Sequence, residues 1–190
     1  MLSIKEDIAQ ALQVLKAGGV IIYPTDTIWG IGCDDTNLIA VERIYNIKQR
    51  EDSKSMLVLV NTENMIPSYI EEVPEIAWEL LEASDAPMTL IYPGARNLAN
   101  NLVGSDGTIG IRVSEEVFCK ELIGRFRKPI VSTSANVSGN LPPGNFGEID
   151  ERLLEQVDYV VKWRQDDYSK NNPSSIIKLG LGGEIEVIRK

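Results

Sequence analysis

The sequence predicts an α/β or α+β fold in which helices flank a mixed parallel and antiparallel sheet. Short apolar runs with the length of buried strands alternate with longer stretches whose apolar residues recur at helical spacing. Two apolar runs late in the chain, 174–179 and 184–188, flank a glycine-rich turn and predict a hairpin. The chain has 190 residues and no internal repeat or low-complexity segment, so we expect a single domain over 1–190.

Helices and strands alternate along the predicted chain. Ser3 and Glu6 fit a capping box at the start of the first helix, and Gly18-Gly19 ends it. The expected helices are 3–16, 37–47, 73–83, 115–126 and 146–156. The expected strands are 20–23, 56–60, 88–92, 108–113, one starting at 129–131, then 159–161, 174–179 and 184–188.

The same patterns assign single residues to caps and packing faces. Thr36 is the expected N-cap of the second helix. Trp78 is interpreted as a core residue rather than a base-stacking platform. The residues expected near one face of the second helix are Ile39, Ile44 and Ile47. The residues available for packing on the helix over 115–126 are Val117, Leu122 and Phe126.

The composition excludes several classes of protein. It is 43% hydrophobic and 25% charged, as in ordinary soluble globular proteins. No apolar run approaches the roughly 20 residues that a membrane-spanning helix needs, and the first residues lack the pattern of a signal peptide. We therefore expect a cytoplasmic protein. The net charge of -9 argues against a protein that coats nucleic acid, although it leaves room for a local basic cleft.

The residue types also limit the chemistry. The only cysteines are Cys33 and Cys119, too few for a disulfide framework or a four-cysteine zinc site. The chain has no histidine, which excludes every triad, general base or metal site built on that residue. Catalysis must therefore rest on cations, hydroxyls, amides, carboxylates or a bound metal.

A first candidate site follows the predicted strand over 20–23. Pro24 ends the strand, and a small polar loop, 25–27, follows with Gly30 and Gly32 close behind, where a backbone can approach a ligand. The next helix ends in Lys48 and Arg50, two cations that suggest a phosphate or another anion. The alternative is that these cations only complement the helix dipole.

A second candidate site follows the strand that begins at 129–131. The run 132–139 is rich in hydroxyl and amide side chains, which most often only cap turns. Because both polar runs follow apolar strands, they could converge on one crevice of a mixed sheet. Arg112 shares its strand parity with Gly110 and need not face the apolar layer, so it is either exposed to solvent or part of such a crevice.

Common nucleotide and hydrolase motifs are missing from the sequence. There is no Gly-x-x-x-x-Gly-Lys-Ser/Thr phosphate loop, no complete dinucleotide fingerprint and no Gly-x-Ser-x-Gly elbow. A nucleotide, if one binds, must therefore be held by dispersed cations.

Four segments together resemble the YrdC family of threonylcarbamoyl-AMP synthases: 24–34, 48–50, 110–113 and 132–139. They occur in the order typical of the family, and the resemblance extends over most of the chain. The resemblance implies a YrdC-like domain whose twisted sheet forms a concave ligand cleft. It also implies a nucleotidyltransferase that combines L-threonine, bicarbonate or CO2, and ATP into threonylcarbamoyl-AMP and pyrophosphate.

The same resemblance implies cofactors and partners. Mg²⁺ would accompany ATP as the triphosphate substrate, with few ligands from the protein. The product is the precursor of threonylcarbamoyladenosine in tRNA. Downstream threonylcarbamoyl-transfer proteins and tRNA are therefore indirect partners, and no membrane is involved.

Site residues are carried over from the matching motifs. The cations are assigned to the ATP phosphates and the carbamate, Ser134 and Asn136 to orienting the nucleotide and the carbamate, and Thr25 to threonine. The residues implied as catalytic are Lys48, Arg50, Ser134 and Asn136. The residues implied as substrate-binding are Thr25, Thr27, Lys54, Arg112, Ser132 and Arg189. No metal ligand is assigned.

The chain departs from the family pattern in two places. Glu51 replaces the usual proline after Lys-x-Arg, and Ser84-Asp85-Ala86 replaces the usual Trp-Pro-Gly, which affects loop rigidity more than reacting groups. Two other functions stay open. One is a module that binds double-stranded RNA or tRNA. The other is the carbamoyl-adenylate-forming domain of hydrogenase maturation, which belongs to a much longer chain with zinc-binding cysteines.

Overall fold

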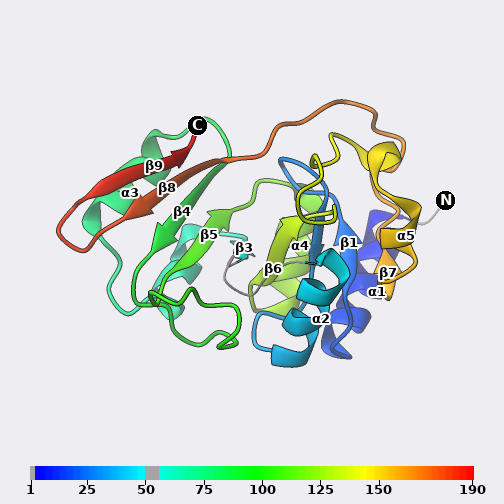
Figure 1. Cartoon of the computed structure of the whole chain (residues 1–190), viewed down its shortest axis with the longest axis horizontal. Coiled ribbons are helices and arrows are strands. Elements are labelled where there is room, and N and C mark those ends of the chain that lie inside the picture. The colour runs from blue at the N-terminus through cyan, green and yellow to red at the C-terminus, as the bar shows by residue number, and fades with distance from the viewer. Residues whose placement is uncertain (1–2, 50–55) are drawn as a thin grey trace.

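The computed structural model describes residues 3–49 and 56–190. Its centre is a nine-stranded sheet with the strand order β7-β1-β2-β6-β3-β5-β4-β8-β9 (Figure 1). The strands are β1 (Ile21–Tyr23), β2 (Gly30–Gly32), β3 (Leu57–Val60), β4 (Met88–Tyr92), β5 (Ile109–Val113), β6 (Ile130–Ser134), β7 (Tyr159–Val160), β8 (Ser175–Leu179) and β9 (Ile185–Arg189).

Helices cover the sheet and join its strands. The α-helices are α1 (Ile4–Lys16), α2 (Leu38–Lys48), α3 (Glu75–Ala83), α4 (Val117–Phe126) and α5 (Glu151–Leu154), and the 3₁₀ helices are η1 (Glu63–Ser68) and η2 (Phe146–Glu148). Helices α1 and α4 pack against each other. Among the described residues, no helix has the length and apolar content needed to cross a membrane.

The sheet is mixed, as the sequence predicts. Strands β1 and β7, β3 and β5, and β4 and β8 pair in parallel. The other neighbouring pairs are antiparallel, including the predicted hairpin of β8 and β9. The expected fold class, a mixed sheet flanked by helices, is therefore confirmed.

Helix α1 begins as predicted, but the start of α2 differs from the prediction. The Ser3 hydroxyl accepts from the Glu6 N–H, and the Glu6 carboxylate accepts from the Ser3 N–H at 2.8 Å, which completes the capping box. The N-cap of α2 is Asn37, whose Oδ1 accepts from the Ala40 N–H at 3.0 Å. Thr36 does not cap the helix: its hydroxyl donates to the Asp34 carboxylate and accepts from Lys128 Nζ at 2.9 Å, which holds it away from the helix N–H groups.

Several predicted packing residues face solvent instead. Ile39 is 77% exposed because it does not share a helical face with Ile44 and Ile47, and Val117 is 58% exposed in the first turn of α4. Trp78, predicted as core, is also exposed on α3. The expected helix over 146–156 is interrupted at Ile149-Asp150, where the Asp150 side chain caps α5 and so starts a new helix.

Strand β2 was not predicted, and it explains the second glycine of the first polar stretch. Gly32 pairs with Ile21, and a Cβ added to it would lie 1.9 Å from the Val131 carbonyl oxygen. Gly32 therefore permits close approach of β2 to β6 rather than approach of a ligand, which corrects the sequence interpretation at this position.

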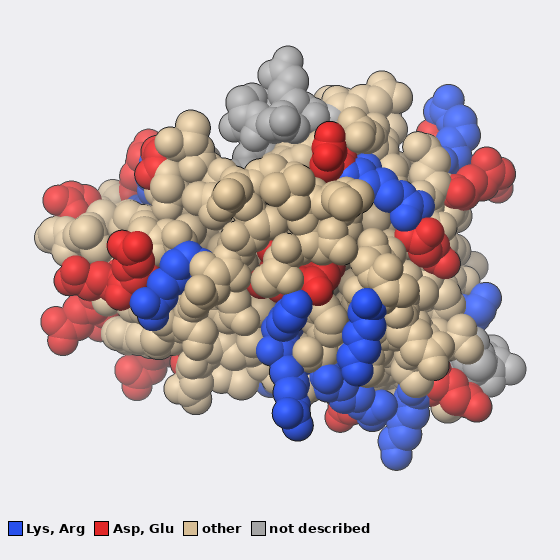
Figure 2. All heavy atoms as spheres, turned by 90° about the horizontal axis from the view of Figure 1, so that it is seen from below, with Lys and Arg blue, Asp and Glu red and all other residues tan. Residues whose placement is uncertain are grey.

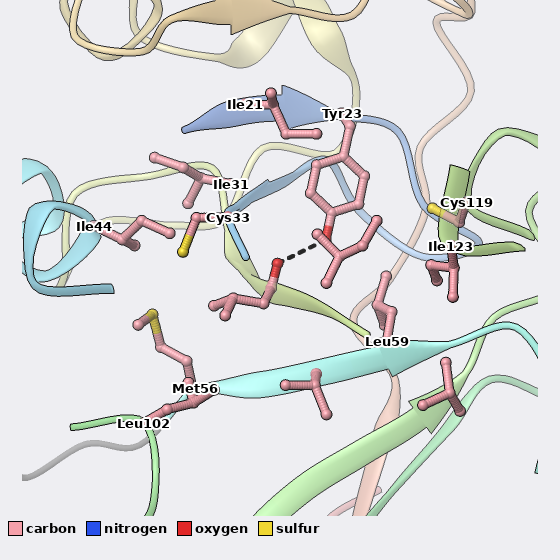
Figure 3. Packing of buried hydrophobic residues seen from close by; sticks show 14 of the residues in the cluster. Ile21, Tyr23, Ile31, Cys33, Ile44, Met56, Leu59, Leu102, Cys119 and Ile123 are labelled. Carbon is pink, nitrogen blue, oxygen red and sulfur yellow. Dashed lines mark hydrogen bonds between the residues drawn. The ribbon is translucent and has the colours of Figure 1, made fainter. Parts of the chain in front are cut away.

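The core is one hydrophobic cluster that runs along the sheet. Near its centre, the buried Tyr23 side chain donates its hydroxyl to the Val131 carbonyl at 3.0 Å (Figure 3). Cys33 and Cys119 are both free and buried there. Burial raises the pKa of both thiols, so neither is an activated nucleophile at neutral pH.

One buried carboxyl gives a testable pH dependence. Asp35 is fully buried, and neither of its carboxylate oxygens has a hydrogen-bond partner among the described residues. Burial, and then the neighbouring Asp34, raises the pKa of Asp35 to about 8. Its carboxyl is protonated in the folded state across a pH range where the unfolded chain ionises, so stability is lost as the pH rises from about 4 to about 8.

We therefore expect Asp35→Asn to stabilise the protein at pH 9 and to change little near pH 4. The expected gain in the free energy of unfolding at pH 9 is about 1–3 kcal/mol, because a buried charge without partners is removed. Urea unfolding at both pH values measures it, with the exposed Asp85→Asn as control. An equal effect of Asp35→Asn at both pH values would contradict the assignment.

Candidate active site

A cleft on the sheet brings together residues from both predicted polar runs. Strands β3, β4, β5 and β8 contribute to its lining, together with Pro173 and Ser174 from the segment before β8. Five of the predicted site residues line it: Thr27, Arg112, Ser132, Ser134 and Arg189. The two runs therefore converge on one crevice, as the sequence predicts.

Two arginines lie in this cleft close enough to affect each other. Burial and the positive charge of Arg112 lower the pKa of Arg189. Arg189 donates its Nε to the Ser174 carbonyl at 2.8 Å, which orients its guanidinium. Arg112 is 4% exposed, and its buried Nε has no hydrogen-bond partner among the described residues. Two like charges in one cleft favour an anionic ligand.

The Thr25 hydroxyl stabilises the small polar loop over 25–27, the first polar loop, through its hydrogen bonds. It donates to the Ile28 carbonyl at 2.7 Å and accepts from the Thr27 N–H at 3.0 Å and from Arg112 Nη2 at 3.2 Å. Thr25 is buried and does not belong to the cleft lining, whereas Thr27 does. The same Arg112 nitrogen lies 3.2 Å from Asp26 Oδ1, so the strand arginine and the loop hold each other.

Lys48 binds the backbone of the second polar run, 132–139, whose loop after β6 is the second polar loop. It is 1% exposed, and its Nζ donates to the Ser134 carbonyl and, at 2.6 Å, to the Asn136 carbonyl. The Ser138 N–H donates to the Lys48 carbonyl at 2.9 Å, which joins the loop to the end of α2 a second time. The Lys48 ammonium therefore acts on the loop backbone, and this accounts for its burial better than a dipole interaction at the helix end.

The other implied catalytic residues are placed differently. Ser134 reaches the cleft at the end of β6. Asn136 is outside the cleft lining and donates its Nδ2 to the carbonyls of Val137 and Asn140 at 3.0 and 2.8 Å, so it closes its own loop. Arg50 and Lys54 lie outside the described residues.

Comparison with known proteins decides the family. The family model Sua5/YciO/YrdC, described as telomere recombination, matches residues 13–190. The chain belongs to the Sua5/YciO/YrdC family. A protein of Pseudoalteromonas translucida (strain TAC 125) named threonylcarbamoyl-AMP synthase is 32% identical over 187 residues, which are 97% of this chain and 98% of that protein.

Solved structures of the Sua5/YciO/YrdC family share the fold. E. coli YciO superposes with a TM-score of 0.85 at 27% identity, covering 100% of this chain and 91% of that one. P. abyssi Sua5, solved in complex with L-threonine, superposes with a TM-score of 0.82 at 21% identity over 94% of this chain. This chain covers 52% of the Sua5 chain, about half its length.

The cleft of this Sua5/YciO/YrdC chain also contains polar residues that the sequence did not single out. Thr89 on β4 and Ser174 before β8 place their hydroxyl oxygens 2.8 Å apart, and both line the cleft. Gly110 leaves room beside them, since an added Cβ would lie 3.1 Å from the Leu57 Cβ. In the sequence, Thr89 is only a single polar residue within an otherwise apolar strand, which also fits a satisfied core threonine.

Proposed function

We propose that this protein is an L-threonylcarbamoyladenylate synthase, a nucleotidyltransferase that forms threonylcarbamoyl-AMP and pyrophosphate from L-threonine, bicarbonate or CO2, and ATP. The observation that carries the proposal is the pair of cleft arginines, Arg112 and Arg189, flanked by two hydroxyl-bearing loops. Relatives named threonylcarbamoyl-AMP synthase over nearly the whole chain support it.

The chemistry needs positioning and charge more than a protein nucleophile. The threonine amine adds to CO2 and gives a carbamate, with loss of a proton. A carbamate oxygen then attacks the α-phosphorus of ATP, the bond to the β-phosphate oxygen breaks, and pyrophosphate leaves. Negative charge develops on the phosphoryl oxygens and the leaving group, and preorganised cations stabilise it. A chain without histidine can supply such cations.

The cleft residues then take separate roles. Arg112 and Arg189 bind the nucleotide phosphates, and the Ser134 hydroxyl orients the nucleotide. Lys48 and Asn136 act on the reaction by fixing the loop that carries Ser134. Arg50 and Lys54, assigned from their motif alone, contribute further positive charge to the phosphates and the carbamate.

The amino acid is assigned to the end of the cleft formed by the first loop. Thr27 presents its side chain there, and Ser132 lies on the adjacent strand β6. Thr25, which the family resemblance assigns to threonine contact, supports this end indirectly, because its hydroxyl fixes the conformation of the loop.

Mg²⁺ enters this scheme as part of the substrate. Within the described part of the chain, no carboxylate lines the cleft. The described residues also contain no group of three His, Cys, Asp or Glu side chains that could hold a metal ion. Mg²⁺ keeps several waters and takes phosphate oxygens readily, so it would be carried by the triphosphate. The oxygen ligands that the cleft lining offers are side-chain hydroxyls, among them those of Ser132 and Ser134.

The charge distribution favours the enzyme over an RNA-binding module. In Figure 2, several basic side chains project along the lower edge of the face and others lie at its right and left, while acidic side chains gather at the left end and also lie among the basic ones. Many of the surface cations are already paired with carboxylates, as Lys120, Arg125 and Lys178 are with Glu115, Glu121 and Asp106. A module for double-stranded RNA needs phosphate-binding cations that are available along its surface.

The proposed function also implies a domain organisation, a cellular location and downstream partners. We assign residues 1–190 to one YrdC-like domain acting in the cytoplasm, where its adenylate would pass to threonylcarbamoyl-transfer proteins that modify tRNA. The single hydrophobic cluster along the sheet supports one domain.

The function is tested by pyrophosphate release from ATP without RNA. We expect release only when L-threonine and bicarbonate are both supplied, because the carbamate is the attacking group and either omission removes it. L-serine is expected to be poorer by about 10- to 200-fold, the discrimination that one methyl group provides. Release without threonine would indicate another nucleotidyl transfer. No release, combined with tight and salt-sensitive RNA binding, would favour the binding module.

A further inference from the structure

Arg164 is a partly buried cation that contacts the first polar loop (25–27) and does not line the cleft. Its Nη1 donates to the Thr25 carbonyl at 3.3 Å and to Glu116 Oε2 at 2.8 Å. Its Nε and Nη2 both donate to Asp167 Oδ2, at 3.1 and 2.8 Å. The guanidinium fork thus joins three segments that are far apart in the sequence: the first loop, the N-cap of α4 and the tail after β7.

The backbone around Arg164 is fixed by residues outside the cleft. Asp7 of α1 is 1% exposed and accepts from the N–H groups of Lys162 and Trp163 at 2.9 and 2.6 Å. Trp163 Nε1 donates to Glu116 Oε1 at 3.1 Å. Arg164 itself has a φ of +64°, a conformation that a non-glycine residue keeps only where its surroundings impose it.

Two arginines therefore hold Thr25 from two sides. Arg112 donates to the hydroxyl of Thr25, and Arg164 donates to its carbonyl. Arg112 faces the cleft, whereas Arg164 does not line it. A change at Arg164 therefore acts on the substrate indirectly, first of all through the position of the loop that presents Thr27.

The tail also connects Arg164 to the other side of the cleft. From Arg164 the chain crosses the top of the molecule to β8 (Figure 1). It reaches the cleft at Pro173 and Ser174, where Ser174 bonds Thr89 and Arg189. Arg164 anchors the start of this crossing against Glu116 and the first loop.

We propose that Arg164 is a positioning residue that sets the amino-acid end of the cleft through the Thr25 carbonyl. The inference rests on the proposed function, since it assigns the first loop to L-threonine. It adds that affinity for the amino acid depends on the contact of Arg164 with the first loop. The ATP end depends little on Arg164, because Arg164 makes its hydrogen bonds within the described chain to Thr25, Glu116 and Asp167 and not to Arg112, Arg189 or Ser134.

The test is a comparison of two KM values in Arg164→Gln. We expect the KM for L-threonine to rise about tenfold, the effect of losing one charge-assisted hydrogen bond to the loop. The KM for ATP is expected to stay within about twofold of wild type, because the phosphate-binding residues keep their contacts. Both values come from pyrophosphate release with the other substrate saturating.

Two further variants separate positioning from charge and from general damage. Arg164→Lys keeps the positive charge but lacks the planar fork that reaches Thr25, Glu116 and Asp167 together, so its KM for L-threonine is expected to lie between wild type and Arg164→Gln. Arg152→Gln is the matched control, because Arg152 pairs with Asp150 at the surface with its side chain 85% exposed. We expect no change there.

The outcomes distinguish this inference from the function on which it rests. If wild-type protein fails to release pyrophosphate with threonine and bicarbonate, the proposed function is wrong. If wild type is active and Arg164→Gln keeps both KM values, or raises both equally, the positioning role is wrong. Should Arg164→Gln fail to fold, as judged by circular dichroism and binding of a non-hydrolysable ATP analogue, the same comparison of KM values in Arg164→Lys decides.

Discussion

Replacing Arg112 with alanine is expected to lower kcat/KM for threonine-dependent pyrophosphate release by on the order of 10²- to 10³-fold, the loss typical when one preorganised charge partner is removed. Arg112 is the most enclosed cation in the described cleft lining, with an Nε that no described residue engages. Its guanidinium also lies within 3.2 Å of Asp26 and Thr25. The variant therefore loses the proposed contact with the nucleotide phosphates and the contacts with Thr25 and Asp26 that order the first loop.

Arg112→Ala also leaves the Asp26 carboxylate without its cation, so the variant needs a control for lost stability. The side chain of Asp26 is 10% exposed and would lose its cationic neighbour, which destabilises a buried carboxylate. The double variant Arg112→Ala, Asp26→Asn removes this cost, so it should recover stability without recovering activity. Arg125→Ala, which breaks a surface pair on α4, serves as the arginine control. Full recovery of activity in the double variant would assign Arg112 a purely structural role.

Local sequence patterns predicted most strands of the sheet. They failed where a residue's structure depends on a contact with another part of the chain. Apolar runs located every strand except β2, whose Gly-Ile-Gly sequence has no β-branched run and is held mainly by pairing with β1 and β6. Thr36 and Asn37 are both good N-caps, and the contacts of the Thr36 hydroxyl with Asp34 and with the remote Lys128 decide between them.

The candidate site shows the same division. Strand parity indicated that Arg112 need not face the apolar layer, and the family resemblance favoured the cleft, which Arg112 lines together with Gly110. The roles of Lys48 and Thr25 could not be predicted, because a lysine at a helix end and a threonine in a loop look alike whether they face a ligand or the backbone. Arg164 gave no signal at all: its partners Thr25 and Glu116 are 139 and 48 residues away.

The second large effect is expected at Lys48. Lys48→Met keeps a side chain of similar length but removes the donor to the Ser134 and Asn136 carbonyls. We expect the free energy of unfolding to fall by about 1–3 kcal/mol, the cost of leaving such groups without their charged partner. We also expect kcat to fall by on the order of 10²-fold, because small displacements of a positioned group are costly in rate.

Lys16→Met tests whether the effect arises from the helix dipole, since Lys16 occupies the last turn of α1 as Lys48 does of α2, but is exposed. The dipole alone contributes about 0.3–1 kcal/mol at an exposed helix end and nothing to turnover. Urea unfolding gives the stabilities, and pyrophosphate release well below the melting temperature gives the rates of the folded variants. If Lys48→Met changes both quantities as little as Lys16→Met does, the buried ammonium has no role beyond the helix end. If turnover falls while the unfolding curve is unchanged, Lys48 acts on the substrate directly rather than through the loop that carries Ser134.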